Sequence, residues 1–477
     1  MTKSYISLQE IKDEIASGKI SVEKLVKGYL NTISANTRLN AFNEVFKDEA
    51  IISAREVDLR IKNGTAGKLA GMVIAIKDNI CYKSHKVSAS SKILENFTSV
   101  YSSTIVDRLL AEDAVIIGRC NCDEFAMGAS NENSFFGPVK NYADETRVPG
   151  GSSGGSAVAV QAGMCHAAIG TDTGGSVRQP ASFCGLIGLK PTYGRISRHG
   201  IIAYASSFDQ VGPITRSVED AALLLEIMAG TDEYDSTLTN VPVPEYSKNL
   251  AAPAPKKIAY MQEALSSPGV DEEVKSNLVK YIDKLRSDGH TVKPIAFELL
   301  DYLVPTYYIL AMAEASSNLS RYDGVHYGYR SPASVDLVST YKKSRSEGFG
   351  KEVKRRIMLG TFVLSAGYYD AYFAKAQKVR RMIREKTEAI LKEYDFIMVP
   401  TAPEPAFPIG KGPKDPVVTY LADIFTVQAS LTGAPAISLP SGNNSKGLPL
   451  GLQLLSKHFH EQELLNFSRY FLELQKI

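Results

Sequence analysis

The chain has 477 residues, of which 44% are apolar and 22% charged, with a formal net charge of +2. This length allows one large domain or two or three ordinary ones, and the composition is that of a globular protein with a sizeable core. The near-neutral charge, without a long Lys/Arg run, gives no sign of a dominant nucleic-acid surface.

Targeting and metal motifs are absent from the sequence. The N-terminus "MTKSYISLQEIKDEI" lacks the apolar stretch of a secretory signal, and no apolar run reaches the roughly 20 residues that cross a bilayer. Five irregularly spaced cysteines suggest reduced thiols, so we expect a cytoplasmic protein. "CNC" (120–122) lacks zinc-site spacing and the seven histidines form no cluster, so we expect no metal in this chain. No GxxxxGK[ST] loop occurs, so no motif indicates phosphate chemistry.

Alternating helical and strand patterns run along the chain. Helices are predicted over residues 1–60, where "SLQE" (7–10) fits a capping box. The apolar run Met72–Ile76 predicts a buried strand, and "STIVDRLLAEDAVIIGRCN" predicts a helix followed by a strand. The alternation returns in "PKKIAYMQ" and the residues after it, and ends with three late strands and a closing helix. This order predicts an α/β fold around a mixed sheet, without internal repeats or a credible linker.

Two glycine-serine clusters lie close together near the centre of the sequence. They are "PGGSSGGSA" (149–157) and "TDTGGSVRQP" (171–180), and the apolar segment between them suits a buried helix or strand. One such loop alone is compatible with a flexible turn, whereas two around one buried element can bring backbone N–H groups into one pocket. Glycine permits backbone conformations that other residues avoid, and successive N–H groups can then form a nest for negative charge.

Ser176 follows the second glycine run directly and is the candidate nucleophile. The N–H groups before it would hold the oxyanion that forms when a serine attacks a carbonyl. These candidate oxyanion-hole residues are Thr173, Gly174 and Gly175.

A serine nucleophile needs a base, and the sequence offers two arrangements. "GGSSG" (150–154) matches the GxSxG elbow of histidine-dependent hydrolases, but the polar "NYADETRVP" before it is not the apolar strand that this elbow requires. Lys77 ends the apolar run "MVIAI", and burial can lower a lysine pKa far enough for it to act as a base. A strand-end lysine alone is usually solvated; beside two serine clusters, Lys77 becomes the candidate base.

The pieces "AIKDN", "GGSSGGS" and "TDTGGSVRQP" occur here in the order in which the amidase signature family has them, and the chain resembles that family. The resemblance implies a mixed sheet covered by helices on both faces. It also implies a Ser-cisSer-Lys triad, with Ser176 as nucleophile, Ser152 as relay and Lys77 as base. One domain would span residues 1–477, with a helical segment at 1–60, a catalytic core at about 65–230 and a substrate-pocket and closing portion at about 255–477.

Further segments, among them "DEFAMGASNENSFFGPVKN" and "YLADIFTVQASLTGAPAISLP", extend the resemblance from about residue 20 to about residue 465. They are similar to the family's glutaminase subunits of tRNA-dependent amidotransferases. This implies that Arg356 grips the α-carboxylate of glutamine, that Asp423 pairs with its α-ammonium and that Tyr307 adds a hydrogen bond. From the residues alone, Arg356 would belong to a solvated basic helix and Asp423 would be a helix N-terminal acid.

The implied activity is release of ammonia from glutamine for partner subunits B and C, which would amidate misacylated Glu-tRNA(Gln). ATP and Mg²⁺ would be used by the partner, and this chain would hold no cofactor. Two alternatives stay open: a stand-alone amidase for other small amides, and a non-catalytic scaffold protein.

Overall fold

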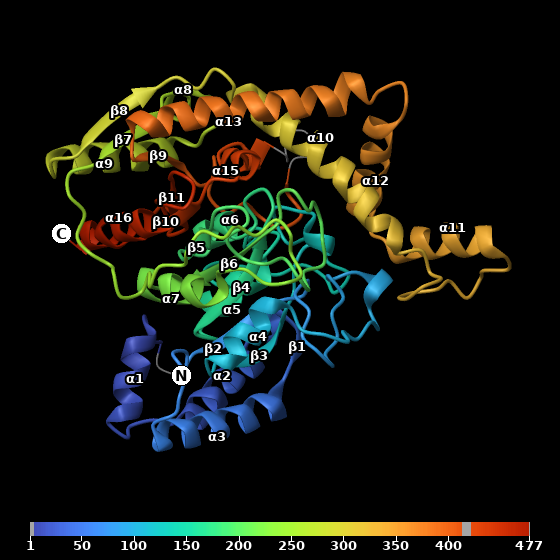
Figure 1. Cartoon of the computed structure of the whole chain (residues 1–477), viewed down its shortest axis with the longest axis horizontal. Coiled ribbons are helices and arrows are strands. Elements are labelled where there is room, and N and C mark those ends of the chain that lie inside the picture. Colours follow the sequence, from blue (N-terminus) through green and yellow to red (C-terminus); the bar gives the residue numbers. More distant parts are fainter. Residues whose placement is uncertain (1–3, 413–420, 477) are drawn as a thin grey trace.

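A computed structural model describes residues 4–412 and 421–476 of the chain (Figure 1). Within them, eleven strands form one sheet in the order β1-β3-β2-β4-β6-β5-β10-β11-β9-β7-β8. The strands are β1 (Phe42–Val45), β2 (Val73–Lys77), β3 (Val115–Cys120), β4 (Ala167–Asp172), β5 (Ile187–Lys190), β6 (Gln210–Thr215), β7 (Lys257–Met261), β8 (Thr291–Ile295), β9 (Phe396–Pro400), β10 (Ala436–Asn443) and β11 (Pro449–Leu455).

The sheet is mixed, as the sequence predicted. β2 runs parallel to β3 and β4, and β7 runs parallel to β8 and β9. The strands from β4 through β6, β5, β10 and β11 to β9 pair antiparallel. Every residue of β2, β3 and β4 is buried, which explains their continuous apolar sequences.

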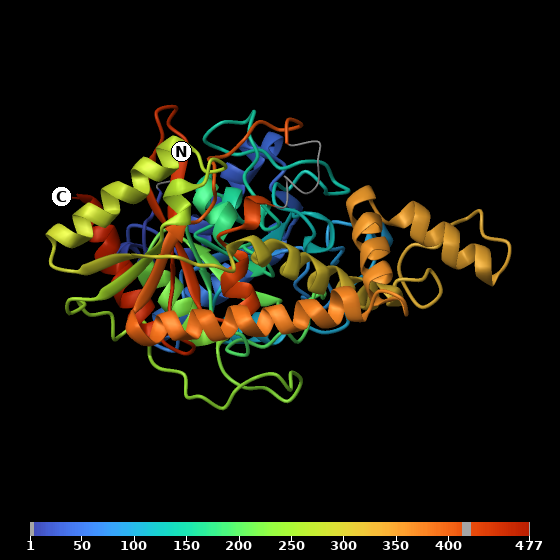
Figure 2. The same ribbon diagram turned by 90° about the horizontal axis from the view of Figure 1, so that it is seen from above.

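Helices cover both faces of the sheet (Figures 1 and 2). Those of the first half are α1 (Leu8–Ala16), α2 (Val22–Ala35), α3 (Lys47–Asn63), α4 (Thr104–Ala111), α5 (Gly154–Gln161), α6 (Arg178–Phe183) and α7 (Val218–Met228). Those of the second half are α8 (Glu263–Ser266), α9 (Glu272–Ser287), α10 (Leu300–Asn318), α11 (Leu337–Gly348), α12 (Lys351–Leu364), α13 (Lys375–Glu393), α15 (Val427–Thr432) and α16 (Glu461–Glu473).

Short helical turns complete the described elements. The 3₁₀ turns are η1 (Thr37–Leu39), η2 (Lys92–Leu94), η3 (Glu124–Ala126), η4 (Leu319–Arg321), η6 (Leu421–Asp423) and η7 (Leu474–Lys476), and η5 (Asp370–Ala374) is a π-helical turn.

The N-terminal segment differs from its prediction at one element. Helices α1, α2 and α3 are present, and the Ser7 side chain accepts a hydrogen bond from the Glu10 N–H at the start of α1. Phe42–Val45, however, forms strand β1 and pairs antiparallel with β3. A four-residue strand at a sheet edge depends on its distant partner, so helical periodicity did not reveal it.

The apolar segment between the two glycine-serine clusters contains both predicted alternatives. It begins with α5 and, after a turn, continues into β4, which ends at Asp172. β2 ends at Lys77 and lies parallel to β4, with Ile76 opposite Ile169. The carboxyl ends of the two strands therefore meet at one edge of the sheet, where the second cluster begins.

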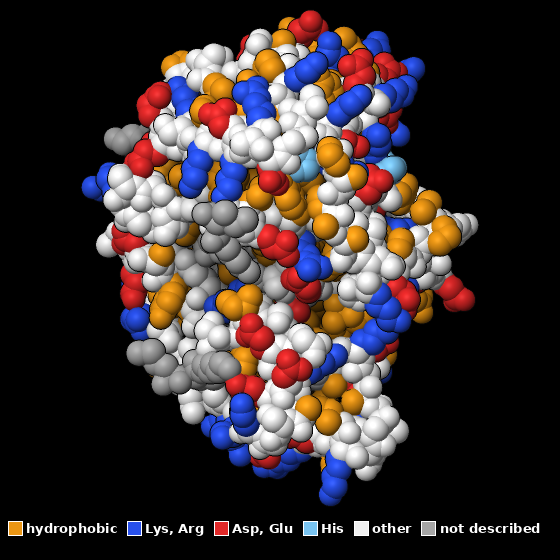
Figure 3. Space-filling view, turned by 90° about the vertical axis from the view of Figure 1, so that its left-hand side faces the viewer, with side chains coloured by type: hydrophobic (Ala, Val, Ile, Leu, Met, Phe, Trp, Pro, Cys, Tyr) orange, Lys and Arg blue, Asp and Glu red, His pale blue; other side chains and the backbone are white. Residues whose placement is uncertain are grey.

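The long helices α10, α12 and α13 lie beside the sheet, and α11 extends away from the body (Figure 2). No helix of residues 4–412 and 421–476 is long and apolar enough to cross a membrane. On the face shown in Figure 3, positive and negative side chains are interspersed, consistent with the small net charge.

Candidate active site

Lys77 is fully buried at the end of β2, and its ammonium group is surrounded by hydroxyls. Lys77 Nζ lies 2.7 Å from Ser152 Oγ, 2.9 Å from Ser153 Oγ and 3.0 Å from Thr171 Oγ1. Burial lowers the pKa of Lys77 to about 8, although acidic groups farther away act in the opposite direction. The amine can therefore lose its proton near neutral pH, as a base must.

The two serines beside Lys77 have different hydrogen-bonding roles. The Ser153 hydroxyl donates to the Thr171 carbonyl at 3.1 Å, so its proton is engaged and it can only accept from Lys77. Thr171 Oγ1 also accepts from the Asn79 amide at 3.0 Å. A neutral amine has two N–H donors and one lone pair, so Ser152 is the hydroxyl best placed to donate to that lone pair. The Gly151–Ser152 peptide bond is cis, as the resemblance implies.

Ser176 lies between the end of β4 and the start of α6, beside the Ser152 loop. The Ser153 N–H donates to the Ser176 carbonyl at 3.2 Å, and the Gly151 N–H donates to the Gln179 side chain at 2.9 Å. These two hydrogen bonds join the two glycine-serine clusters on either side of the nucleophile. Ser176 keeps 7% of its surface exposed, whereas Ser152 has none, which suits an attacking group and its relay respectively.

A buried ion pair braces the Ser176 loop. Arg178 Nε and Nη2 donate to the two carboxylate oxygens of Asp172 at 3.0 and 2.8 Å, and both side chains are fully buried. Burial alone would raise the pKa of Asp172, but Arg178 outweighs it and holds this pKa below its ordinary value. The Asp172 carboxylate also accepts from the Val177 N–H at 3.1 Å, which fixes the turn around Ser176.

The glycines of the candidate oxyanion hole are packed against other side chains. A Cβ on Gly174 would lie 2.5 Å from the Tyr307 ring, and one on Gly175, which has φ +141°, would lie 2.4 Å from Thr426 Oγ1. Thr173 Oγ1 donates to Asp209 at 2.7 Å. The residues predicted for the hole therefore form a confined loop in which only glycine fits at two positions.

Arg356 is buried on α12, whereas the neighbouring Lys354 is exposed and Arg355 is half-buried. Its guanidinium donates to the Glu352 carboxylate and to the Tyr204 hydroxyl, each at 2.9 Å, and lies over the Tyr308 ring. The solvated-helix alternative therefore does not describe Arg356, whose planar donors are suited to gripping a carboxylate.

Asp423 is buried in the turn η6, close to Arg356's neighbour Tyr308. The Tyr308 hydroxyl donates to Asp423 Oδ2 at 2.6 Å, and burial raises the pKa of Asp423 to about 6. Thr426, three residues after Asp423 and at the start of α15, donates its hydroxyl to the Gly174 carbonyl at 2.6 Å, which connects this acid to the nucleophile loop. Tyr307, predicted as a glutamine contact, lies with its ring against Gly174.

Several residues at this site were not predicted from the sequence. They are Ser153, Thr171, Tyr204, Tyr308 and Glu352, which contact Lys77, Arg356 or Asp423. Ser153 and Thr171 stand in quoted motifs and Tyr308 is adjacent to the predicted Tyr307, so the local sequence held a signal for these three residues. Tyr204 is 152 residues from Arg356, and only the fold brings them together.

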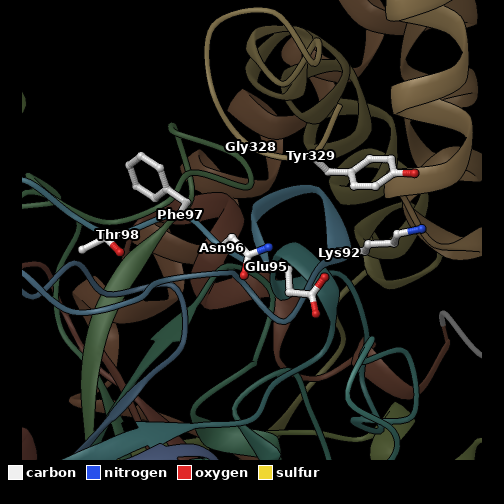
Figure 4. Close-up of a pocket in the computed structure, with 7 residues that line it drawn as sticks. All are labelled: Lys92, Glu95, Asn96, Phe97, Thr98, Gly328 and Tyr329. Carbon is white, nitrogen blue, oxygen red and sulfur yellow. The ribbon is translucent and has the colours of Figure 1, made fainter. Parts of the chain in front are cut away.

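A separate pocket of about 230 Å³, which no triad residue lines, is formed by residues of η2 and the following loop together with Gly328 and Tyr329 (Figure 4). Lys92 Nζ lies 4.3 Å from the centre of the Tyr329 ring there. Within the described ranges, no group of three or more His, Cys, Asp or Glu side chains could hold a metal ion.

Comparison with known proteins adds to this geometry. The Amidase family model matches residues 24–465. The chain is 50% identical to the glutamyl-tRNA(Gln) amidotransferase A subunits of Chlorobium phaeobacteroides and of Chlorobaculum tepidum, over 97% of this chain and 98% and 96% of theirs. The crystal structure of the corresponding protein from Thermotoga maritima is 41% identical, with a TM-score of 0.76, over 94% of this chain and 90% of the other. The peptide amidase of Stenotrophomonas maltophilia is 29% identical with a TM-score of 0.82, over 98% and 96%.

Proposed function

Because the chain belongs to the amidase family, we propose that it hydrolyses the side-chain amide of glutamine as the ammonia-generating component of a glutamyl-tRNA(Gln) amidotransferase. The observation that carries this proposal is the buried Lys77–Ser152 hydrogen bond at 2.7 Å. The nucleophile loop beside it is joined to the segment that carries Asp423 by the hydrogen bond from the Thr426 hydroxyl to the Gly174 carbonyl. A carboxylate-binding arginine and an ammonium-binding aspartate fit the two α-groups of an amino acid.

The reaction starts with proton transfer towards neutral Lys77. Ser152 passes its proton to Lys77 as it takes the proton of Ser176, and Ser176 Oγ forms a bond to the amide carbon of glutamine. The carbonyl oxygen becomes negative and is held by N–H groups of the preceding loop. Each such donor is typically worth about 3 kcal/mol in the transition state.

The tetrahedral intermediate then loses ammonia. The C–N bond breaks, the leaving nitrogen takes a proton through Ser152, and a glutamyl ester remains on Ser176. Water attacks this ester in the second half of the cycle, Lys77 again accepts a proton through Ser152, and glutamate leaves with the serine restored. Each half-reaction begins and ends with the same protonation state of Lys77.

The clamp would select glutamine over simple amides. Arg356 would bind the α-carboxylate through its paired donors, and Asp423, when ionised, would pair with the α-ammonium. Ammonia would pass to partner subunits B and C, which would use ATP and Mg²⁺ to amidate misacylated Glu-tRNA(Gln). We place this activity in the cytoplasm, and the five buried cysteines, none paired in a disulfide, support that setting.

The test is ammonia release from L-glutamine, L-asparagine and simple amides by the wild-type chain, produced alone and together with subunits B and C. Ser176→Ala should abolish ammonia release. Ser287 is an exposed serine on α9, and the control variant Ser287→Ala should release ammonia at the wild-type rate. Intact mass should detect a glutamyl adduct on the wild type. Preference for another amide would instead favour a stand-alone amidase, and unchanged release by Ser176→Ala would refute the assigned nucleophile.

A further inference from the structure

The run Asp123–Phe125 lies between the triad and the clamp, yet the mechanism above uses none of its residues. All three side chains are buried in or beside the turn η3. Asp123 contacts the loop of Ser152, and Glu124 and Phe125 contact the residues that precede α12, so the run is placed to connect these two parts of the site.

Asp123 contacts the loop that carries the relay serine. Its N–H donates to the Ser152 carbonyl at 3.1 Å, and its carboxylate accepts from the N–H groups of Asn131 and Asn133 at 2.9 and 3.1 Å. The carboxylate lies so close to Gly151 that a Cβ there would come within 2.2 Å of Asp123 Oδ2. The Gly151–Ser152 segment therefore packs directly against the Asp123 carboxylate.

Glu124 contacts the helix that carries the clamp arginine. Gly350 is the N-cap of α12, and its N–H donates to the two carboxylate oxygens of Glu124 at 3.1 and 2.9 Å. The Ser91 hydroxyl donates to the same carboxylate. A carboxylate at a helix N-terminus satisfies a backbone N–H that has no partner within the helix and is favoured by the helix dipole.

Phe125 adds an apolar contact to the same junction. Its ring lies 5.6 Å from that of Phe349, the first of the two residues between α11 and α12, and 5.0 Å from that of Tyr322. Glu124 and Phe125 together fix the point at which the chain enters α12.

Arg356 lies six residues after Gly350, or about 9 Å along the helix axis. Toward its other end, α12 is pressed against α10, since a Cβ on Gly360 would lie 1.9 Å from the Met312 carbonyl oxygen. The helix is thus held on both sides of Arg356, by α10 on one side and by Glu124 on the other.

We propose that Glu124 is a positioning residue for Arg356 and Asp123 one for Ser152, so that this run sets the spacing between the glutamine clamp and the triad. The proposal rests on the proposed function, because it concerns the binding of glutamine. The two neighbouring acids should therefore affect different kinetic constants. Glu124 should affect KM, through the affinity for glutamine, and Asp123 should affect kcat, through the chemical step.

The test compares steady-state glutaminase kinetics of full-length variants, co-produced with subunits B and C. Glu124→Gln keeps the shape of the side chain but turns an N–H donor toward the Gly350 N–H, so it should raise KM for glutamine roughly tenfold with kcat within about twofold. Asp123→Asn should lower kcat roughly tenfold and leave KM nearly unchanged. Ser91→Ala, which removes one donor to Glu124, should raise KM by a smaller factor. Glu95→Gln, in the separate pocket of Figure 4, is the matched control and should change neither constant.

The division between constants separates positioning from a general loss of stability. A variant that is merely less folded contains less active enzyme, so its apparent kcat falls while KM stays constant. Because the same pattern is expected for Asp123→Asn, its kcat is expressed per folded chain, with the folded fraction measured by circular dichroism. If Glu124→Gln lowers kcat alone, or leaves both constants unchanged, the proposal is wrong. If that variant does not fold, Ser91→Ala takes its place, and an unchanged KM in Ser91→Ala would overturn the proposal. Failure of the proposed function would be recognised separately, because the wild type would then release no ammonia from glutamine.

Discussion

Lys77 Nζ and Ser152 Oγ lie 2.7 Å apart, and neither side chain is exposed to solvent. In water, a lysine would be almost fully protonated at neutral pH and could not accept a proton from a serine. Burial removes the hydration that stabilises the ammonium and lowers the pKa to about 8. The same burial that makes Lys77 a base therefore makes the rate depend on pH.

The first prediction concerns this pH dependence. Activity requires neutral Lys77, and its neutral fraction rises about tenfold per pH unit below its pKa. We expect kcat/KM for glutamine to increase from pH 6 to a plateau above about pH 8. Initial rates of ammonia release in buffers of constant ionic strength would measure it. A profile that is flat or falls between pH 6 and 8 would contradict Lys77 as the base.

Substitutions of Lys77 test directly whether this residue is the base that causes the pH dependence. Lys77→Ala should remove activity from a folded chain, and Lys77→Arg should be nearly as damaging, because a guanidinium does not give up its proton in this pH range. Circular dichroism would show whether each variant is folded. Ammonia release at the wild-type rate by a folded Lys77→Ala variant would show that Lys77 is not the base.

The second prediction concerns the clamp. Burial raises the pKa of Asp423 to about 6, and only the carboxylate form can pair with an ammonium. KM for glutamine should therefore rise as the pH falls below about 6, and Asp423→Asn should have a high KM at every pH. Tyr308 donates to this carboxylate and lowers its pKa, so Tyr308→Phe should shift the rise of KM to a higher pH. If KM of Tyr308→Phe instead began to rise at a lower pH than in the wild type, Tyr308 would not lower the pKa of Asp423 and this explanation would be wrong.

The third prediction concerns the ion pair that braces the nucleophile loop. Arg178→Met would leave the Asp172 carboxylate buried without its partner, which typically costs about 3–5 kcal/mol of the free energy of unfolding. The exposed pair of Lys248 and Glu245 is the control, and Lys248→Ala should leave the urea midpoint unchanged. Equal midpoints for Arg178→Met and wild type would show that the pair does not stabilise the fold.

Much of the catalytic chemistry could be predicted from local sequence. The Lys77 strand, the serine loop and the Ser176 loop each read as a short motif, and the structure brings Lys77 and Ser152 into direct contact. Strands β2, β3 and β9 were also visible, because each is a predominantly apolar run that is buried along its whole length. Strand β5, by contrast, is four residues long and depends on pairing with β10 and β6.

The clamp could not be derived from pattern alone. Arg356 lies in a basic run that is indistinguishable, by sequence, from an exposed helix face; burial against Tyr204 and Tyr308 is a product of tertiary packing. Asp423 likewise acquires its partner from α10, 115 residues earlier. Only the resemblance to the amidase family pointed to these two residues before the fold was known.

The fourth prediction concerns Gly174, where Tyr307 of α10 touches the nucleophile loop. Gly174→Ala would place a Cβ 2.5 Å from the Tyr307 ring, so the loop or the ring must move. A shift of about 1 Å in the reacting groups can lower the rate about a hundredfold, and we expect a loss of kcat of this order. Gly367→Ala, where a Cβ meets nothing within 4 Å, should leave kcat unchanged.

A double-mutant cycle would show that the contact with Tyr307 causes this loss. With Tyr307→Leu as background, the ring is gone and Gly174→Ala should reduce kcat by a much smaller factor than it does in the wild type. Identical factors in the two backgrounds would mean that the glycine is required for another reason, such as the backbone conformation of the oxyanion hole. The cycle therefore separates the need for space beside the Tyr307 ring from any other requirement for glycine at position 174.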